Sequence, residues 1–339
     1  MVNVCINGYG TIGKRVAEVI ARHEKLKLLG VSKYSPDSDA KLAVLNGFKV
    51  FVPREKVQEF QEKKIPVAGT VDELLDASDL VIDCSPDKTG EKNKAVYSGK
   101  GKKAVFQGGE EEGIGFSFNA RSNFDDAKGK QFVRVVSCNT TGYCRILKPL
   151  GEKYKIESVF ATLIRRGADL NDSKGSALNS VDWKANSHHA DDVKSVLKGV
   201  KISSVAFKVP HTHAHINSLL VKFNGNAPSK DELRELYKGE RVVVLEKAKS
   251  SSQVIEAARD LGLKRFDLFM PCILLNTVMT EGDSLFLTFI TPQESIVVPE
   301  NVDAAVAQTG VMGRKESMDY TDELMGLKDT KAKLEKVFS

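Results

Sequence analysis

One cysteine and a group of histidines carry the residue types that catalysis near neutral pH most often uses. Cys138 lies in the segment Ser-Cys-Asn-Thr-Thr-Gly, where an apolar run ends and a helical pattern begins. Asn and Thr are frequent where helices start, and the dipole at a helix N-terminus favours a thiolate. The other cysteines lie in apolar runs or inside the helical pattern, where they are interpreted as packing residues. The pattern therefore indicates Cys138 as a nucleophile.

Five of the six histidines lie within 28 residues, from 188 to 215. Three of them, His211, His213 and His215, alternate along a segment with a strand-like pattern, so all three are expected on one face. A histidine that acts as a base near neutral pH is one use of such a group. A zinc or copper site is another, because imidazoles on one face can ligate a metal ion. The residues alone leave both uses open.

A glycine-rich segment opens the chain. Gly8, Gly10 and Gly13 form Gly-x-Gly-x-x-Gly between an apolar strand pattern at 2–7 and helical spacing at 11–23. In this context the first glycine permits a tight turn, the second lets the backbone approach a pyrophosphate, and the third allows close packing of helix and strand. The helix N-terminus supplies N–H donors to the phosphates. The segment predicts a dinucleotide site, and the alternative is an ordinary strand-to-helix turn.

The end of the second predicted strand (26–33) bears on which dinucleotide binds. Lys33 stands 20 residues after Gly13, where an acidic residue normally binds the ribose diol. A lysine attracts a 2′-phosphate that an acid repels, so the sequence predicts NADP in preference to NAD or beside it. The alternatives are that Lys33 is a solvated strand end, or that Asp37 or Asp39 folds back to the ribose.

The elements that must position these residues differ between the two halves of the chain. Up to residue 138, strand and helix patterns alternate, which is typical of a parallel sheet covered by helices. Later strands are longer (157–166, 202–210, 213–223), and a pair within 266–291 meets at a Glu-Gly-Asp turn. The predicted fold class is α/β, with an α+β second domain whose sheet is mostly antiparallel. The predicted domains are 1–138, 139–300 and a helical segment at 301–339.

Composition narrows the class of protein. With 339 residues the chain is longer than a domain with a single hydrophobic core usually is. Its longest apolar run, eight residues at 268–275, is too short to cross a bilayer, and no signal-like segment opens it, so we expect a cytoplasmic protein without membrane contact. The five cysteines include no metal-type Cys-x-x-Cys pair, which fits a reducing compartment. The net charge of +5 is spread along the chain and does not indicate nucleic acid.

Several motifs together make the chain similar to a known family over nearly its full length. They are INGYGTIGKR (6–15), FQGGE (106–110), SCNTTGYCR (137–145), RRGAD (165–169), SHHADDV (187–193) and PQESIVVPENVDA (292–304). The chain resembles the glyceraldehyde-3-phosphate dehydrogenases, specifically their archaeal branch, which has Ser-Cys-Asn-Thr-Thr where the bacterial and eukaryotic branch has Ser-Cys-Thr-Thr-Asn.

The resemblance implies a Rossmann domain, a catalytic domain and a covalent mechanism. The Cys138 thiolate attacks the aldehyde carbon of glyceraldehyde 3-phosphate, hydride passes to NADP or NAD, and inorganic phosphate cleaves the thioester. His215 is implied as the base, with His213 as the alternative. Many relatives have a further histidine where this chain has Asn217, and that histidine is taken as dispensable. No resident metal is expected.

The resemblance also implies which residues contact the ligands and how the chain assembles. Homotetramers form largely through the second domain's sheet, and the segment from about 301 packs back onto the first domain. Cofactor contacts are implied for Gly8, Gly10, Thr11, Ile12, Gly13, Lys33, Gly109, Arg166 and Gln293, and substrate contacts for Ser137, Asn139, Arg165, His188 and His189.

Two other classes of protein share part of this pattern. A semialdehyde or acyl-phosphate dehydrogenase shares the plan of dinucleotide domain and cysteine, but its substrates carry carboxylates, and the paired histidines and RRGAD argue against it. A non-catalytic dinucleotide-binding regulator retains the fold, but the intact set of Cys138, His215 and the arginine pair makes it the weaker alternative.

Overall fold

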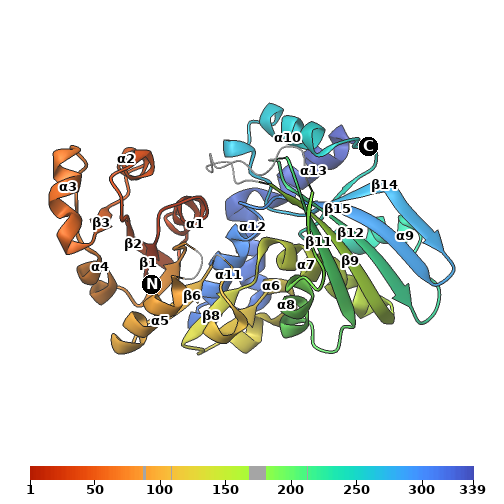
Figure 1. The fold of residues 1–339 in the computed structure, drawn as a ribbon, viewed down its shortest axis with the longest axis horizontal. Helices are drawn as coiled ribbons and strands as arrows, with labels where there is room; N and C mark the ends of the chain where they lie inside the picture. Colours follow the sequence, from red (N-terminus) through yellow and green to blue (C-terminus); the bar gives the residue numbers. More distant parts are fainter. Residues whose placement is uncertain (87–88, 108, 168–180, 212) are drawn as a thin grey trace. The chain divides into compact units, whose positions relative to one another are not determined.

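The structure is a computed structural model that describes residues 1–86, 89–107, 109–167, 181–211 and 213–339 (Figure 1). The chain forms two compact units. Unit 1 comprises Met1–Val136 and Val298–Met325, and unit 2 comprises Ser137–Val297 and Gly326–Ser339. The segment 301–339 was expected to stay together on the first domain. That expectation is wrong for its last part, because Gly326–Ser339 groups with unit 2.

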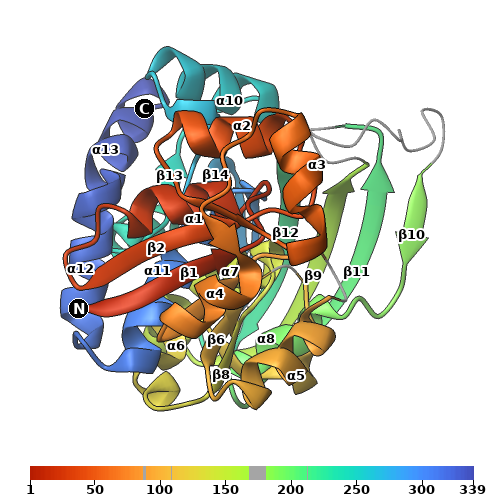
Figure 2. The same ribbon diagram turned by 90° about the vertical axis from the view of Figure 1, so that its left-hand side faces the viewer.

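Unit 1 is built on a parallel sheet of eight described strands (Figure 2). Each adjacent pair of these strands runs parallel. In spatial order they are β4 (Gly69–Thr70), β3 (Val50–Val52), β2 (Leu26–Ser32), β1 (Val2–Asn7), β5 (Leu80–Asp83), β6 (Lys103–Phe106), β8 (Phe132–Val135) and β7 (Phe116–Phe118). The chain order reverses between β1 and β5, which makes the carboxyl ends of these strands the expected ligand-binding edge.

Helices follow most of these strands because capping residues start them where the strands end. Thr70 and Glu73 form a capping box at the first turn of α4 (Val71–Ala77), and Asp37 caps α2 (Ser38–Leu45). The other helices of unit 1 are α1 (Gly13–Ile20), α3 (Val57–Glu62), α5 (Gly90–Gly99), α6 (Ala120–Asn123), α11 (Val298–Thr309) and α12 (Arg314–Met325), with 3-10 turns η1 (Arg54–Lys56), η2 (Glu112–Ile114) and η3 (Phe124–Ala127). The sheet is the Rossmann-like α/β fold that the sequence predicts.

Unit 2 is built on a mixed sheet of seven described strands. In spatial order they are β10 (Asp182–Lys184), β11 (Ile202–Val209), β9 (Ile156–Arg166), β12 (His215–Phe223), β15 (Ser284–Thr291), β14 (Cys272–Glu281) and β13 (Val243–Leu245). Four pairings are antiparallel, whereas β11–β9 and β13–β14 are parallel. The Glu281-Gly282-Asp283 turn joins β14 to β15, with Gly282 at φ +57°.

One face of this second sheet is covered by α7 (Cys138–Lys153) and α8 (His189–Val196). Tyr143, Ile146 and Leu150 of α7 are fully buried in one cluster with Leu219 and Phe289 of the sheet. The remaining helices of unit 2 are α9 (Lys230–Tyr237), α10 (Ser251–Asp260), η4 (Lys264–Phe266) and α13 (Leu327–Val337). Among the described residues, no helix combines the length and apolar character needed to span a membrane.

Candidate active site

Cys138 is the first residue of α7, directly after β8 and the short link to unit 2. Ser137 is the N-cap, and its Oγ accepts a hydrogen bond from the Thr140 amide over 3.3 Å. The predicted place of Cys138 at a helix N-terminus is therefore confirmed. Cys138 as a whole residue is intermediate between buried and exposed.

The surroundings of the Cys138 thiol act in two directions on its ionisation. Burial raises the pKa of Cys138 to about 12, while the Asn139 amide and the charges of Arg166 and Arg165 lower it by less. Glu294 adds to the raising effect. The Asn139 amide at the helix N-terminus and the two arginines favour the thiolate that the sequence predicts, but they do not outweigh burial of the thiol.

A hydrogen-bond cluster joins the first turn of α7 to β12. The Nδ2 group of Asn217 donates to Asn139 Oδ1 over 3.1 Å and to Thr291 Oγ1 over 2.9 Å, and Tyr143 donates its hydroxyl to Asn217 Oδ1. Asn217 is fully buried and Asn139 nearly so. The side chain of Asn139, predicted to contact substrate, thus points into unit 2 and supports the strand. Asn217, to which the sequence assigns no role, holds the helix start in place.

His215 lies two residues before Asn217 on β12 and therefore on the same strand face. Asn217 on that face bonds Asn139, the residue that follows Cys138 in the first turn of α7. The ring is 2% exposed, and its Nδ1 accepts a hydrogen bond from the Arg166 amide over 3.1 Å. Burial, reinforced by the charges of Arg166 and Arg165, holds the pKa of His215 well below its ordinary value. The ring is neutral at pH 7, with its proton on Nε2.

The other two histidines of the predicted strand do not share its face. β12 begins only at His215, and Ala214 before it has φ +64°, which is incompatible with an extended strand. His213 instead packs edge-on against Phe266, with ring centroids 6.2 Å apart. The expectation of three histidines on one strand face is therefore wrong. The argument for a zinc or copper site depended on that shared face, so it no longer holds.

The two arginines at the end of β9 point to opposite faces of the strand, as adjacent strand residues are expected to do. Arg166 is 3% exposed and forms an ion pair with Glu294, in the turn after β15. Arg165 is exposed, and its charge acts on Cys138, His215 and His189. Both arginines therefore act on the nucleophile with positive charge. Glu294 was missed at the sequence level, although it follows Gln293 directly in the PQESIVVPENVDA motif.

The paired histidines stand at the start of α8. Their rings stack with centroids 4.1 Å apart, and His188 is exposed whereas His189 is buried. The Nδ1 atom of His189 lies 2.6 Å from Ser187 Oγ. Burial, together with the neighbouring His188 and Arg165, lowers the pKa of His189 to about 3. His189 is thus a neutral hydrogen-bonding group, while His188 and Arg165 face solvent.

In unit 1 the three glycines occupy the positions that the fingerprint predicts. Gly8 has φ +98°, and a Cβ on it would lie 2.8 Å from the backbone of Cys84. A Cβ on Gly13 would lie 2.0 Å from the Gly8 carbonyl oxygen. A Cβ on Gly10, in contrast, meets no described atom within 4 Å. The loop, including Thr11 and Ile12 before α1, leaves open the approach that a pyrophosphate needs at the helix N-terminus.

A buried polar network that the sequence did not predict bonds this loop through the Gly8 amide. Ser32 Oγ accepts from the Gly8 amide over 2.9 Å and donates to Asn7 Oδ1 over 2.6 Å. Asn7 Nδ2 donates to the Tyr97 hydroxyl over 2.6 Å, which in turn donates to Asp83 over 2.6 Å. The network joins the ends of β1, β2 and β5 to α5. Its signal in the sequence is polar residues that end otherwise apolar strands.

Lys33 follows β2 at the same edge of the sheet, and Gly109, with φ +88°, follows β6 there. Lys33 is 9% exposed, and its ammonium lies 2.8 Å from Asp37. The alternative that Lys33 is a solvated strand end is therefore wrong. Gln293, the remaining predicted cofactor contact, lies in unit 2 in the turn after β15 and is partly exposed.

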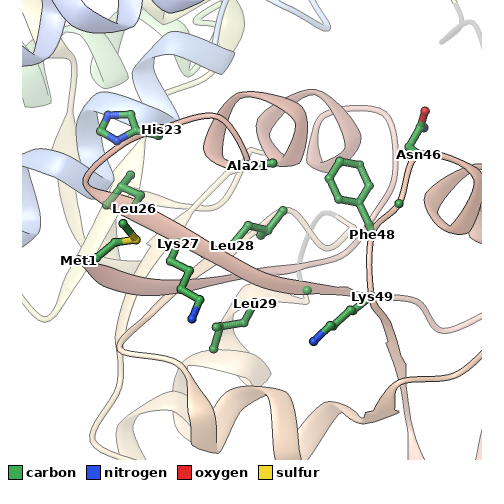
Figure 3. Close-up of a pocket in the computed structure, with 12 residues that line it drawn as sticks. Met1, Ala21, His23, Leu26, Lys27, Leu28, Leu29, Asn46, Phe48 and Lys49 are labelled. Carbon is green, nitrogen blue, oxygen red and sulfur yellow. The ribbon is translucent and has the colours of Figure 1, made fainter.

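A groove of about 580 Å³ in unit 1 lies apart from this edge (Figure 3). Met1 lines it before β1, Leu26 and Lys27 line it at the start of β2, and Phe48 and Lys49 line it before β3. The lining continues along β2 to Gly30, and it includes neither the glycine loop nor Lys33. It is not part of the candidate site.

A Rossmann-like sheet with an open glycine loop, together with a cysteine at a helix start and a buried histidine on the strand that bonds this helix start, is typical of the cysteine-dependent dehydrogenases that use a dinucleotide. A family profile described as "Glyceraldehyde 3-phosphate dehydrogenase, C-terminal domain" matches residues 137–260. The chain is 41% identical over 332 residues to the glyceraldehyde-3-phosphate dehydrogenase of Sulfolobus acidocaldarius, and 37% identical over 334 residues to that of Sulfurisphaera tokodaii. Each alignment covers 96% of this chain and 97% of the relative. The chain belongs to the glyceraldehyde-3-phosphate dehydrogenase family and is an oxidoreductase.

Proposed function

We propose that the chain oxidises and phosphorylates D-glyceraldehyde 3-phosphate to 1,3-bisphosphoglycerate with a nicotinamide dinucleotide. The observation that carries the proposal is the Asn217 cluster, because it binds the helix start that bears Cys138 to the strand face that bears a buried, neutral His215. The names of the relatives support the substrate, and the open glycine loop supports the coenzyme.

Cys138 performs the first step as its thiolate, favoured by the charges of Arg166 and Arg165. Its sulfur forms a bond to the aldehyde carbon, and the carbonyl π electrons move to oxygen. Because Nδ1 of His215 accepts the Arg166 amide, Nε2 carries the proton and can donate to that oxygen. The sequence predicts a base; the hydrogen bond favours His215 as a donor in this step.

The second and third steps complete the reaction at the same sulfur. When bound, the nicotinamide accepts the hydride that leaves the hemithioacetal carbon. The alkoxide electrons re-form the carbonyl, which leaves a thioester on Cys138. Inorganic phosphate then attacks the thioester carbonyl, and the carbon–sulfur bond breaks to release the acyl phosphate and the thiolate.

Anion binding is assigned to the cationic and hydrogen-bonding groups around the cysteine. We assign the substrate phosphate to His188, His189 and Arg165, of which Arg165 supplies a fixed charge and His189 a neutral donor or acceptor. Ser137 borders the nucleophile. Arg166 and Gln293 are assigned to the nicotinamide end of the coenzyme.

Both NADP and NAD are assigned as coenzymes, with NADP favoured by Lys33. The buried stem of Lys33 fixes an ammonium at the end of β2, where a 2′-phosphate carries the distinguishing charge. Thr11, Ile12, Gly109 and the three glycines of the loop are assigned to the pyrophosphate and neighbouring groups.

Copies of the chain are proposed to form a homotetramer in the cytoplasm. Phe160 and Leu220 pair across β9 and β12 and are 47% and 48% exposed, and Phe286 continues the row on β15. Such a row on an uncovered sheet face suits burial against a second copy. All five cysteines are free, which fits a reducing compartment.

Absorbance of reduced NADP or NAD tests the activity. Glyceraldehyde 3-phosphate should give a signal that depends on phosphate or arsenate and that is lost in Cys138→Ser. A signal that is independent of phosphate contradicts the phosphorylating reaction, and preference for an aldehyde with a carboxylate would favour the semialdehyde dehydrogenases. Light scattering after gel filtration tests the tetramer.

A further inference from the structure

Two carboxylates at the start of α2 each hold a lysine at the coenzyme edge of unit 1. Asp37 Oδ2 lies 2.8 Å from the ammonium of Lys33, at the end of β2. Asp39 Oδ1 lies 2.7 Å from the ammonium of Lys14, in the first turn of α1. The turn thus supplies one negative charge for each of two lysines that come from different elements.

The position of Asp37 is fixed by the backbone of α2. Its Oδ1 atom accepts the Ala40 amide over 2.9 Å as the N-cap of the helix, which leaves Oδ2 for Lys33. Burial opposes its ionisation, but the hydrogen bonds from Lys33 and Ala40 prevail and lower the pKa of the carboxyl. Lys33 is equally restrained, because its side chain is only 10% exposed. Neither partner can turn away without losing these contacts.

A 2′-phosphate and a 2′-hydroxyl would interact differently with the ion pair of Lys33 and Asp37. An ammonium that bonds a phosphate oxygen over about 2.8 Å while it stays paired brings that oxygen within roughly 5.6 Å of Asp37 Oδ2. At that separation the two negative charges repel each other, and breaking the ion pair instead leaves Asp37 without its cation. A 2′-hydroxyl carries no charge and can donate a hydrogen bond to a carboxylate.

We propose that Asp37 is a specificity-determining residue, which opposes NADP and so permits NAD by holding the ammonium of Lys33. The proposal rests on the assignment of unit 1 as the dinucleotide site of a dehydrogenase. Lys33 attracts the 2′-phosphate and Asp37 restrains that attraction, so the chain binds both coenzymes. The acidic residue that normally binds the ribose is here four positions further along the chain, at the N-cap of α2, and acts through a lysine.

Calorimetric titration of the full chain with NADP and NAD tests the proposal without any turnover. Asp37→Asn keeps the size of the side chain and an oxygen for the Ala40 amide, so the cap of α2 is retained. This variant should shift the ratio of the two dissociation constants toward NADP by about twofold to fivefold, mostly through tighter NADP binding. Asp37→Ser, which also caps helices, should shift it in the same direction.

Two further variants separate the proposed cause from general charge effects. Asp39→Asn removes an equal charge from the same turn but frees Lys14, so its shift should be smaller than that of Asp37→Asn. In a Lys33→Ala background, Asp37→Asn should lose most of its effect. An unchanged ratio in Asp37→Asn overturns the proposal, and so does an equal shift with and without Lys33.

The fragments 2′,5′-ADP and 5′-AMP distinguish a failure of this proposal from a failure of the proposed function. If neither dinucleotide nor either fragment binds, the dinucleotide assignment of unit 1 is wrong, and the proposal falls with it. If all bind and the ratio does not respond to Asp37, the dinucleotide site stands and Asp37 has no role in specificity.

Discussion

The backbone amide of Arg166 donates a hydrogen bond to Nδ1 of His215 over 3.1 Å. Since an amide can only donate, Nδ1 must carry a lone pair, and the proton of the neutral ring is on Nε2. The same residue, Arg166, places a positive guanidinium near both His215 and Cys138. One strand end therefore fixes the tautomer of the histidine and favours the thiolate of the cysteine.

Substitutions of His215 should show whether the ring acts by donating a hydrogen bond from Nε2 or in another way. His215→Ala should lower kcat by about 10²–10⁴-fold, because the developing alkoxide loses its hydrogen-bond donor. His215→Gln, whose amide nitrogen can occupy the place of Nε2, should recover about tenfold of that loss. The measurement is steady-state kcat for glyceraldehyde 3-phosphate oxidation. If Gln is no better than Ala, donation by Nε2 is not what the ring contributes.

His213→Ala is the matched control for His215. His213 packs against Phe266 outside β12, so its removal should change kcat by less than about twofold. Loss of turnover in His213→Ala with an active His215→Ala would reverse the assignment.

The ionisation of Cys138 predicts how the free protein reacts with iodoacetamide. Burial raises the pKa of Cys138 to about 12, so below that pH the thiolate fraction grows about tenfold for each pH unit. The rate of alkylation should therefore rise steeply from pH 7 to pH 10. Cys138→Ser gives the background rate from the other cysteines, of which Cys5, Cys144 and Cys272 are buried. A rate that levels off below pH 8 contradicts a raised pKa.

The ion pair between Arg166 and Glu294 should tune this reactivity in opposite directions. Arg166 lowers and Glu294 raises the pKa of Cys138. Glu294→Gln should thus speed alkylation at pH 8 by at least about threefold, and Arg166→Met should slow it by a similar factor. Asp283→Asn, at the β14–β15 turn, removes a carboxylate outside this pair and should change nothing. Shifts of the same sign in both variants would show that packing, not charge, controls the thiol.

The sequence predicted those parts of the fold and site that depend on local pattern. The glycine fingerprint, the alternation of strands and helices, the helix start at Cys138 and the Glu281-Gly282-Asp283 hairpin each occupy a few adjacent residues, so their signals are complete in the chain. The predicted strand that bears His215 begins two residues too early. The alternation of His and small residues continues through Ala214, but the positive φ of Ala214 ends the extended conformation there.

The missed residues act through partners that are distant in the chain. Asn217 bonds residues from α7 and β15, 78 and 74 positions away, and Glu294 pairs with Arg166 at a separation of 128. Only the order β9–β12–β15 in the sheet makes these residues neighbours. The grouping of Gly326–Ser339 with unit 2 has the same cause, since Glu335 accepts the Val244 amide over 3.0 Å.

Asn217 should be required for both stability and turnover. Asn217→Ala leaves the Asn139 carbonyl and the Tyr143 hydroxyl buried without their partner, which should cost about 2–4 kcal/mol in the free energy of unfolding. Because Asn139 is next to Cys138, kcat should fall more than KM rises. Ser218→Ala, on the opposite face of β12 with one hydrogen bond to Thr288, should cost about 1 kcal/mol and spare kcat. Urea unfolding and kinetics below the transition provide both values.

The second and third glycines of the loop should respond differently to the same substitution. In Gly13→Ala the new Cβ would lie 2.0 Å from the carbonyl oxygen of Gly8, so the loop and α1 must separate and the melting temperature should fall. In Gly10→Ala the Cβ meets no described atom within 4 Å, so stability should be kept. The added methyl nevertheless lies where a pyrophosphate approaches the backbone, and binding of NADP and NAD should weaken by at least about tenfold. Calorimetry and thermal unfolding of both variants give the comparison. Unweakened coenzyme binding by a stable Gly10→Ala protein would mean that the pyrophosphate does not bind at this loop.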